Sequence, residues 1–192
     1  MQYPITPELK RIEPYSWWEG AFNKEELDWL QQKAKEADQQ AQVGGDEAAT
    51  NLEIRRTKLN WLHNDEDNEI IFERLGHIVS NLNANYYGFD IMGFGEPLQL
   101  ANYHENKQGM YTWHQDFGQG VSRKLSLVLQ LSEPDEYEGG ELQLLCKKEP
   151  ISIQKQRGLI TVFPSWTLHQ VTPVIKGSRQ SLVAWVSGAP FK

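Results

Sequence analysis

Short segments of alternating apolar residues, separated by turn residues, fill the second half of this 192-residue chain. The clearest is residues 124–131, where every second residue from 125 to 131 is leucine. Alternate side chains of a strand point to the same face, so these leucines would form one buried row. Similar segments are expected at residues 97–103, 141–145, 158–163, 169–174 and 180–186. Many short strands at such spacing predict a β-sandwich or barrel.

Two amphipathic patterns in the first half predict helices. The first begins at Asn23, because Asn23 and Glu26 stand at capping-box spacing and apolar residues then recur at steps of three and four through Ala37. The second is expected over residues 67–86, with Gly88 as its stop signal. The Gln/Ala-rich stretch that ends near Asp46 loses this periodicity and is expected to form a loop at the site entrance.

Residues 51–62 alternate enough to predict one strand, and Arg55, Arg56 and Lys58 are interpreted as solvated residues of its edge. Helices gathered on one side of many short strands predict an α+β, mainly β fold, a jelly roll backed by N-terminal helices. The length fits one domain. We therefore expect residues 1–192 to form a single domain, with helical support and the first strands in 1–96 and a jelly-roll core in 97–192.

Charge and cysteine content exclude several classes of function. The net charge of −7 and the lack of a long Lys/Arg stripe argue against a nucleic-acid partner. No window approaches the roughly 20 apolar residues of a membrane span, and the start of the chain has no secretory pattern, so a cytoplasmic protein without membrane contact is expected. Cys146 is the only cysteine, so neither an intrachain disulfide nor a thiolate metal cluster can form.

A metal pair lies in the hexapeptide Tyr111-Thr-Trp-His-Gln-Asp116. His114 and Asp116 would project from one face of an extended strand and could hold a metal ion. Two ligands are too few for a tight site, and His169 is the candidate third. Two histidines and one carboxylate leave coordination positions open, as in non-haem Fe(II) oxygenases. A catalytic zinc site with the same ligands is the alternative.

The other three histidines are interpreted as structural. His77 falls within the second expected helix, and His63 lies beside an acidic loop. His104 would point away from Tyr103, because neighbouring side chains of a strand alternate.

Arg179 favours an iron site over a zinc site. It is expected on the strand that follows His169, with a turn at residues 176–178 bringing it back alongside that histidine. A buried guanidinium there needs an anion, and its planar fork suits a carboxylate. Ser181 on the same face, and Tyr103 from across the barrel, could donate further hydrogen bonds. An iron site beside such an arginine fits 2-oxoglutarate.

Six ordered segments resemble the iron and 2-oxoglutarate dependent dioxygenases, and more closely the prolyl 4-hydroxylase-like group with its PKHD-type hydroxylases. They are His114-Gln-Asp116, Arg123-Lys-Leu-Ser126, Tyr137-Glu-Gly-Gly-Glu-Leu142, Phe163-Pro-Ser-Trp166, His169-Gln-Val-Thr-Pro173 and Lys176-Gly-Ser-Arg179.

The resemblance implies a double-stranded β-helix, the cupin-like jelly roll, with Fe(II) on His114, Asp116 and His169. It also implies O2 and 2-oxoglutarate as cosubstrates, with the distal 2-oxoglutarate carboxylate on Arg179 and a contact from Tyr103. Ascorbate is a candidate further cofactor. The implied reaction hydroxylates a C–H bond, with a prolyl residue of a protein or peptide as the favoured substrate. Collagen-type members usually carry Lys in place of Arg179, which favours the bacterial and viral PKHD-like branch.

Several questions stay open at the level of sequence. The substrate could instead be a free amino acid or another small molecule, and a non-catalytic metal-binding jelly-roll module is the alternative from another class. Arg123 is expected at the mouth of the site. Trp113, Trp166 and Trp185 are candidates for the pocket wall, with Trp166 the preferred one. Gly139 and Gly140 predict a turn leading into a strand.

Overall fold

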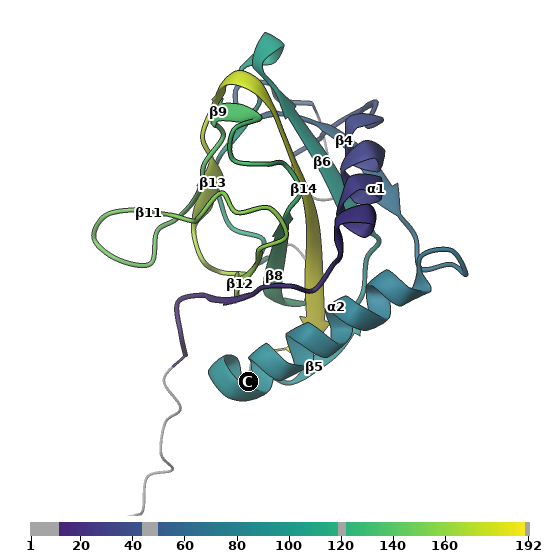
Figure 1. Cartoon of the computed structure of the whole chain (residues 1–192). Helices are drawn as coiled ribbons and strands as arrows, with labels where there is room; N and C mark the ends of the chain where they lie inside the picture. The colour runs from purple at the N-terminus through teal and green to yellow at the C-terminus, as the bar shows by residue number, and fades with distance from the viewer. Residues whose placement is uncertain (1–11, 44–49, 119–121, 191–192) are drawn as a thin grey trace, which may run out of the picture.

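The computed structural model describes residues 12–43, 50–118 and 122–190 (Figure 1). Within these ranges two antiparallel sheets of nine and five strands form the mainly β jelly roll that the sequence predicts. The larger sheet contains β1 (Ser16–Trp18), β2 (Gln39–Gln40), β4 (Lys58–Leu62), β5 (Ile91–Phe94), β6 (Leu98–His104), β8 (Arg123–Gln130), β9 (Tyr137–Gly139), β12 (Ile160–Pro164) and β14 (Val174–Gly188). The smaller sheet contains β3 (Arg55–Arg56), β7 (Met110–His114), β10 (Leu142–Leu144), β11 (Ile151–Ser152) and β13 (His169–Val171).

Two helices support the larger sheet. Helix α1 (Lys24–Lys35) starts with the predicted capping box: the Asn23 side chain accepts from the Glu26 N–H, and the Glu26 carboxylate accepts from the Asn23 N–H. Helix α2 (Glu69–Leu82) continues into a π-helical turn, η2 (Asn83–Tyr87), and ends at Gly88 with φ of 68°. Both helix predictions are confirmed, including the glycine stop.

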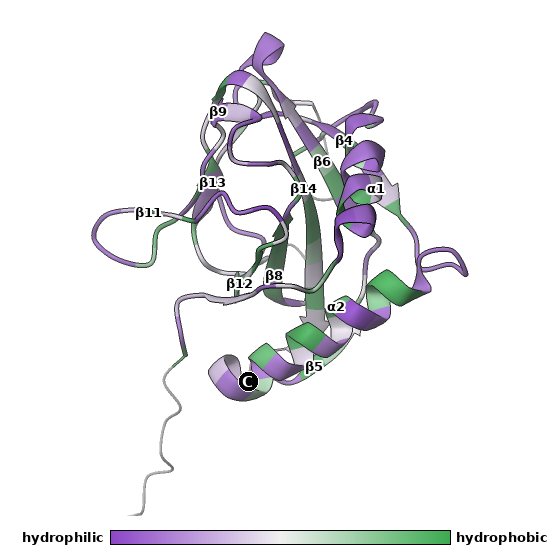
Figure 2. Ribbon diagram, viewed as in Figure 1, coloured by the Kyte–Doolittle hydropathy of each residue, from purple (hydrophilic) through white to green (hydrophobic). Residues whose placement is uncertain are grey.

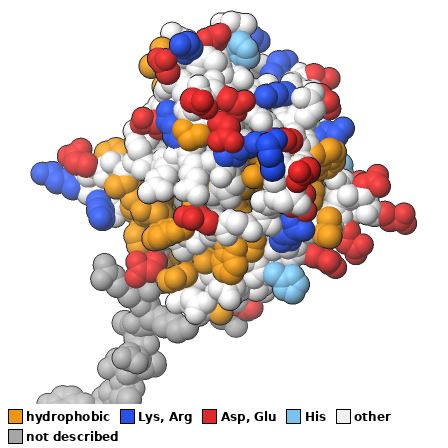
Figure 3. Space-filling view, viewed as in Figure 1, with side chains coloured by type: hydrophobic (Ala, Val, Ile, Leu, Met, Phe, Trp, Pro, Cys, Tyr) orange, Lys and Arg blue, Asp and Glu red, His pale blue; other side chains and the backbone are white. Residues whose placement is uncertain are grey.

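The main core lies between these helices and the larger sheet. The alternate leucines of the 124–131 segment are fully buried there, beside Leu30 of α1 and Leu75 of α2. Figure 2 shows the apolar residues along β8 and β14 and on α2. On the face seen in Figure 3, Lys and Arg side chains are interspersed with Asp and Glu rather than gathered into a stripe. No helix in the described part of the chain is long and apolar enough to cross a membrane.

The predicted strand over residues 51–62 is wrong in one respect that matters for the site. Residues 52–54 form a turn, and the extended chain after it breaks at Thr57 into β3 and β4, which belong to different sheets. Strand β3 pairs with β7 of the smaller sheet, while β4 pairs with β6 of the larger one. Arg55 is therefore directed into the molecule, and it is 7% exposed rather than solvated at an edge.

The predicted turn at residues 176–178 is also wrong. Gly177 has φ of 74° within one long strand, β14, which continues from Val174 to Gly188. The first residues of β14 pair with β9, residues 178–183 pair with β6, and the last residues pair with β5, while β8 lies along the opposite edge from Ser181 to Ser187. Because β13 and β14 belong to different sheets, Arg179 does not lie on the strand beside His169. Gly139 and Gly140 do have positive φ, as the predicted turn before β10 requires.

Candidate active site

Strands β7 and β13 bring the three predicted metal ligands together. His114 and His169 are paired across these neighbouring strands, and Asp116 follows the end of β7. Nε2 of His114 lies 3.8 Å from Oδ1 of Asp116, and Nε2 of His169 lies 3.5 Å from Oδ2 of the same carboxylate. One candidate ligand atom from each residue lies within 4.8 Å of the others, so the three could hold a single metal ion.

Backbone carbonyls orient both imidazoles. Nδ1 of His114 donates to the Thr112 carbonyl at 2.7 Å, and Nδ1 of His169 donates to the Thr167 carbonyl at 2.9 Å. In each case the acceptor lies two residues earlier in the chain. A hydrogen on Nδ1 leaves the Nε2 lone pair available, which is the arrangement that metal-bound histidines usually have.

Asp116 is held by its own set of contacts. The Ser126 hydroxyl of β8 donates to Oδ2 at 2.6 Å, and the Asp116 N–H donates to the Ser165 carbonyl at 2.9 Å. Burial raises the pKa of Asp116, whereas the neighbouring His169 and His114 rings and the Ser126 hydrogen bond lower it, and the net shift is downward. The carboxylate is therefore ionised and fixed, as a metal ligand must be.

The electrostatics of His114 also suit a ligand. Burial, followed by the neighbouring His169, lowers the pKa of His114 to about 3, so its imidazole is neutral near pH 7. Tyr111 stacks on this imidazole with 3.4 Å between the ring centroids. Stacking on Tyr111 thus limits tilting of the His114 imidazole, and the hydrogen bond to the Thr112 carbonyl limits its rotation.

Arg179 lies on strand β14 of the larger sheet and is 2% exposed. Its Nη1 donates to the Ser181 hydroxyl at 3.2 Å, on the same face of β14 as predicted. Tyr103 is the paired residue on the adjacent strand β6, with its ring centroid 5.5 Å from the guanidinium carbon, so it lies beside Arg179 rather than across the barrel. Tyr137 is a neighbour without a sequence-based role: burial raises its pKa, against the opposing effect of Arg179.

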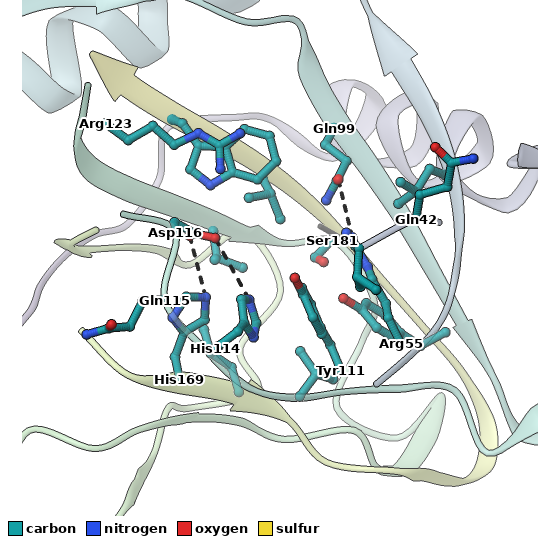
Figure 4. A pocket seen from close by; sticks show the side chains of 18 of the residues that line it. Gln42, Arg55, Gln99, Tyr111, His114, Gln115, Asp116, Arg123, His169 and Ser181 are labelled. Atoms are coloured by element: carbon teal, nitrogen blue, oxygen red, sulfur yellow. Dashed lines mark hydrogen bonds and ion pairs between the residues drawn. The ribbon is translucent and has the colours of Figure 1, made fainter. Parts of the chain in front are cut away.

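One cavity of about 460 Å³ is lined by the metal-ligand group together with Arg179, Ser181 and Tyr103 (Figure 4). Its volume is in the range of small-molecule sites. Gln42 and Val43 also line it, so the described part of the predicted entrance loop does reach the site.

Arg123 and Trp185 form another part of the wall. The Arg123 guanidinium lies 4.0 Å from the Trp185 ring centroid and pairs with Glu96, with 2.9 Å between Nε and Oε1. Trp185 is thus the tryptophan of the predicted three that lines the cavity. Trp166 instead packs edge-on against Phe89, and its carbonyl accepts a hydrogen bond from Gln115.

The remaining histidines lie outside the metal-ligand group. His104 is exposed, and its Nδ1 accepts a hydrogen bond from the Asn106 N–H at 3.1 Å. His63 and His77 are exposed as well. Arg55 is the lining residue that sequence reasoning misplaced. The available signal was that two arginines in succession on a strand must point to opposite faces, so one of them can be buried.

Comparison with known proteins agrees with the class that this fold and site define, a jelly-roll metal oxygenase. Residues 98–187 match the model of the 2OG-Fe(II) oxygenase superfamily. A PKHD-type hydroxylase of Shewanella sp. strain MR-7 is 30% identical over 177 residues, covering 87% of this chain and 75% of that protein. A PKHD-type hydroxylase of Hyphomonas neptunium is 33% identical over 99 residues, covering 50% of this chain and 44% of that protein.

Solved structures show the same fold. A prolyl hydroxylase from Trichoplax adhaerens superposes with a TM-score of 0.77 at 16% identity, covering 91% of this chain and 84% of that chain. A Pseudomonas putida prolyl-4-hydroxylase gives a TM-score of 0.71 at 19% identity, covering 92% and 94%. This chain belongs to the 2-oxoglutarate and Fe(II) dependent oxygenase superfamily and, within it, to the PKHD-type hydroxylases. Membership implies Fe(II) and 2-oxoglutarate as cofactor and cosubstrate.

Proposed function

We propose that this enzyme hydroxylates a prolyl residue in a protein or peptide. In this proposal His114, Asp116 and His169 hold the iron, and Arg179, with Ser181 and Tyr103, holds the distal carboxylate of 2-oxoglutarate. The observation that carries the proposal is the buried Arg179 in the cavity of the three ligands, without a carboxylate partner among the described residues. A buried guanidinium needs such a partner.

Iron with O2 and 2-oxoglutarate supplies the oxidative chemistry, in which a substrate C–H becomes C–OH and 2-oxoglutarate becomes succinate and CO2. The protein residues bind and position the reactants. The two imidazoles would present Nε2 to the metal, and the Ser126 hydroxyl would keep Asp116 aimed at it. The guanidinium fork of Arg179 can bind a carboxylate through two hydrogen bonds, which sets the direction of the keto acid in the cavity. No side chain has to act as a general base.

Two observations support a peptide substrate. Two of the similar solved structures are prolyl hydroxylases, one of them bound to a peptide fragment of hypoxia inducible factor. In this chain, Gln39, Gln40 and Gln42 are among the residues that line the cavity. Amide side chains offer both donors and acceptors, so they can pair with the backbone groups of an extended peptide.

The test is turnover of a proline-containing peptide library with Fe(II), 2-oxoglutarate and O2. Mass spectrometry should find products one oxygen heavier, with the oxygen on proline, and succinate should form in parallel. His114→Ala should abolish both, whereas His104→Ala changes an exposed histidine outside the site and should not. Ascorbate, the candidate further cofactor, is tested separately by comparing the turnover rates with and without it. Equal rates would show that the reaction does not require ascorbate.

Two results would contradict the proposed substrate. If oxygen is added to a free amino acid or another small molecule while no peptide gains mass, the chemistry stands and the prolyl-peptide assignment is wrong. If no tested compound is oxidised and 2-oxoglutarate is not consumed even slowly without substrate, the roles given to the metal ligands and Arg179 are wrong. A non-catalytic module would be free to lose a metal ligand or Arg179. All four residues are present in this site, so the alternative of a non-catalytic module gains no support.

A further inference from the structure

Arg55 is a second buried arginine in the active-site cavity, and the proposed function does not use it. It is 7% exposed and lines the same cavity as the metal ligands. Its guanidinium carbon lies 4.4 Å from the centroid of the Tyr111 ring, which stacks on His114. Figure 4 shows Tyr111 between His114 and Arg55. The Tyr111 ring would therefore separate a group bound by Arg55 from His114.

The guanidinium of Arg55 is incompletely satisfied. Its Nη2 donates to Oε1 of Gln99 at 3.2 Å, but Nε has no hydrogen-bond partner in the described parts of the chain. Nor does any Asp or Glu of those parts form an ion pair with it. Arg123, which lines the same cavity, is paired with Glu96. Burying an unpaired charge is costly, so an anion is the expected partner of Arg55.

The charges of the loaded site leave room for one more anion. A divalent metal with Arg55 and Arg179 places four positive charges in the cavity, and Asp116 offsets one of them. Bound 2-oxoglutarate would bring two negative charges, one carboxylate of which is assigned to Arg179. One positive charge then remains, and it is the one on Arg55. A singly charged group on the second reactant would neutralise it.

We propose that Arg55 is a substrate-binding residue that pairs with a carboxylate of the molecule hydroxylated in this cavity. The inference rests on the proposed function, because it assumes that a substrate shares the cavity with 2-oxoglutarate. The free Nε–H and a neighbouring guanidinium N–H form the planar fork that a carboxylate fits. Two sources of this group suit the cavity: the terminal carboxylate of an amino acid or peptide, and the side chain of an Asp or Glu residue next to the reacting one.

Isothermal titration calorimetry on the whole chain can test this without turnover, using Mn(II) and saturating 2-oxoglutarate under anaerobic conditions. Three probe pairs differ only in a carboxylate: acetyl-proline and its amide, acetyl-alanine and its amide, and acetyl-Pro-Asp-amide and acetyl-Pro-Asn-amide. We expect at least one acid to bind about tenfold or more tightly than its neutral partner. The pair that shows the preference identifies the source of the carboxylate.

Variants of two adjacent arginines supply the matched control. Arg55→Gln should abolish the preference, and Arg55→Lys should keep part of it because the charge remains. Arg56→Gln removes the same charge from the same strand, but Arg56 donates to the Gln108 carbonyl outside the cavity, so the preference should persist.

Equal binding within all three pairs by the wild-type protein would overturn the proposal, even if no variant folds. A preference that survives Arg55→Gln would also overturn it, since a group other than Arg55 would then hold the carboxylate. A preference for acetyl-alanine without one for either proline acid would support Arg55 and contradict the prolyl assignment, so the two ideas can fail separately.

Discussion

Each proposed metal ligand is held by a neighbouring group of the protein. The histidines use the carbonyls of Thr112 and Thr167, and Asp116 uses the Ser126 hydroxyl. Such supporting contacts commonly change metal affinity by about 10–100-fold when they are removed.

Ser126→Ala should therefore weaken metal binding by about tenfold. The substitution leaves Oδ2 of Asp116 without its hydroxyl donor and frees the carboxylate to rotate. Competition with a metal-binding dye would measure the change. Ser132→Ala is the matched control, because Ser132 is also fully buried but bonds to Gln180 away from the site. Equal metal affinity of wild type and Ser126→Ala would show that this hydrogen bond does not position the ligand.

Arg179→Lys should weaken 2-oxoglutarate binding by about 100-fold while metal affinity stays unchanged. The lysine keeps the positive charge but loses the planar fork and the fixed contact to Ser181. Anaerobic titration with 2-oxoglutarate, in the presence of saturating metal, gives the affinity. An unchanged affinity would mean that the distal carboxylate binds elsewhere, with Arg55 as the first residue to test.

At the residue scale, the sequence was sufficient to predict that His114, Asp116 and His169 converge, and insufficient for Arg55. His114 and Asp116 share a face because a strand fixes the direction of alternate side chains. For Arg55 and Arg56 the same rule separates the two faces but does not say which is buried. That choice depends on the break at Thr57, which places β3 against β7.

At the scale of elements, strand β14 is the one that organises the site. It carries Arg179 and Ser181, pairs with the strand of Tyr103, and contacts β8, which carries Ser126. Lys176-Gly-Ser178 predicted a turn because glycine with positive φ is typical of turns. In the structure the same positive φ lies where β14 pairs irregularly with β9. Local sequence does not distinguish the two, because the pairing partner decides.

Gly177→Ala should destabilise the fold by more than about 2 kcal/mol. A Cβ there would lie 2.0 Å from the Glu136 carbonyl oxygen, in addition to the strain of φ at 74°. Gly20→Ala is the control, since φ is 70° and nothing lies within 4 Å of its Cβ, so about 1 kcal/mol is expected. Urea unfolding of both variants gives the comparison. Equal losses would mean that the backbone near Glu136 moves freely.

At the scale of the whole molecule, the site joins the two sheets. The histidines come from the smaller sheet, and Arg179, Ser181, Tyr103 and Ser126 come from the larger one. The row of leucines and the capped helix predicted the architecture correctly, because burial and capping are local properties of sequence. Which strands share a sheet was not predictable for β13 and β14, because strand partners are set by the packing of the entire barrel.

Ligands that bridge the sheets should stabilise the folded chain. Mn(II) with 2-oxoglutarate at about 100 times their dissociation constants should each add about 2.7 kcal/mol to the free energy of unfolding. Thermal unfolding with neither, one or both ligands measures the additions. In Arg179→Ala the metal should still stabilise, and 2-oxoglutarate should add little. A full second increment in that variant would contradict the assignment of Arg179.

The most direct test of the whole account is the visible absorption of the anaerobic protein with Fe(II) when 2-oxoglutarate is added. The account predicts a weak band that saturates with 2-oxoglutarate in the wild type, is absent in Asp116→Ala, and requires much higher 2-oxoglutarate in Arg179→Ala. A band of wild-type strength in Asp116→Ala, or no band in wild-type protein shown to hold iron, would contradict an iron and keto-acid site built from these residues.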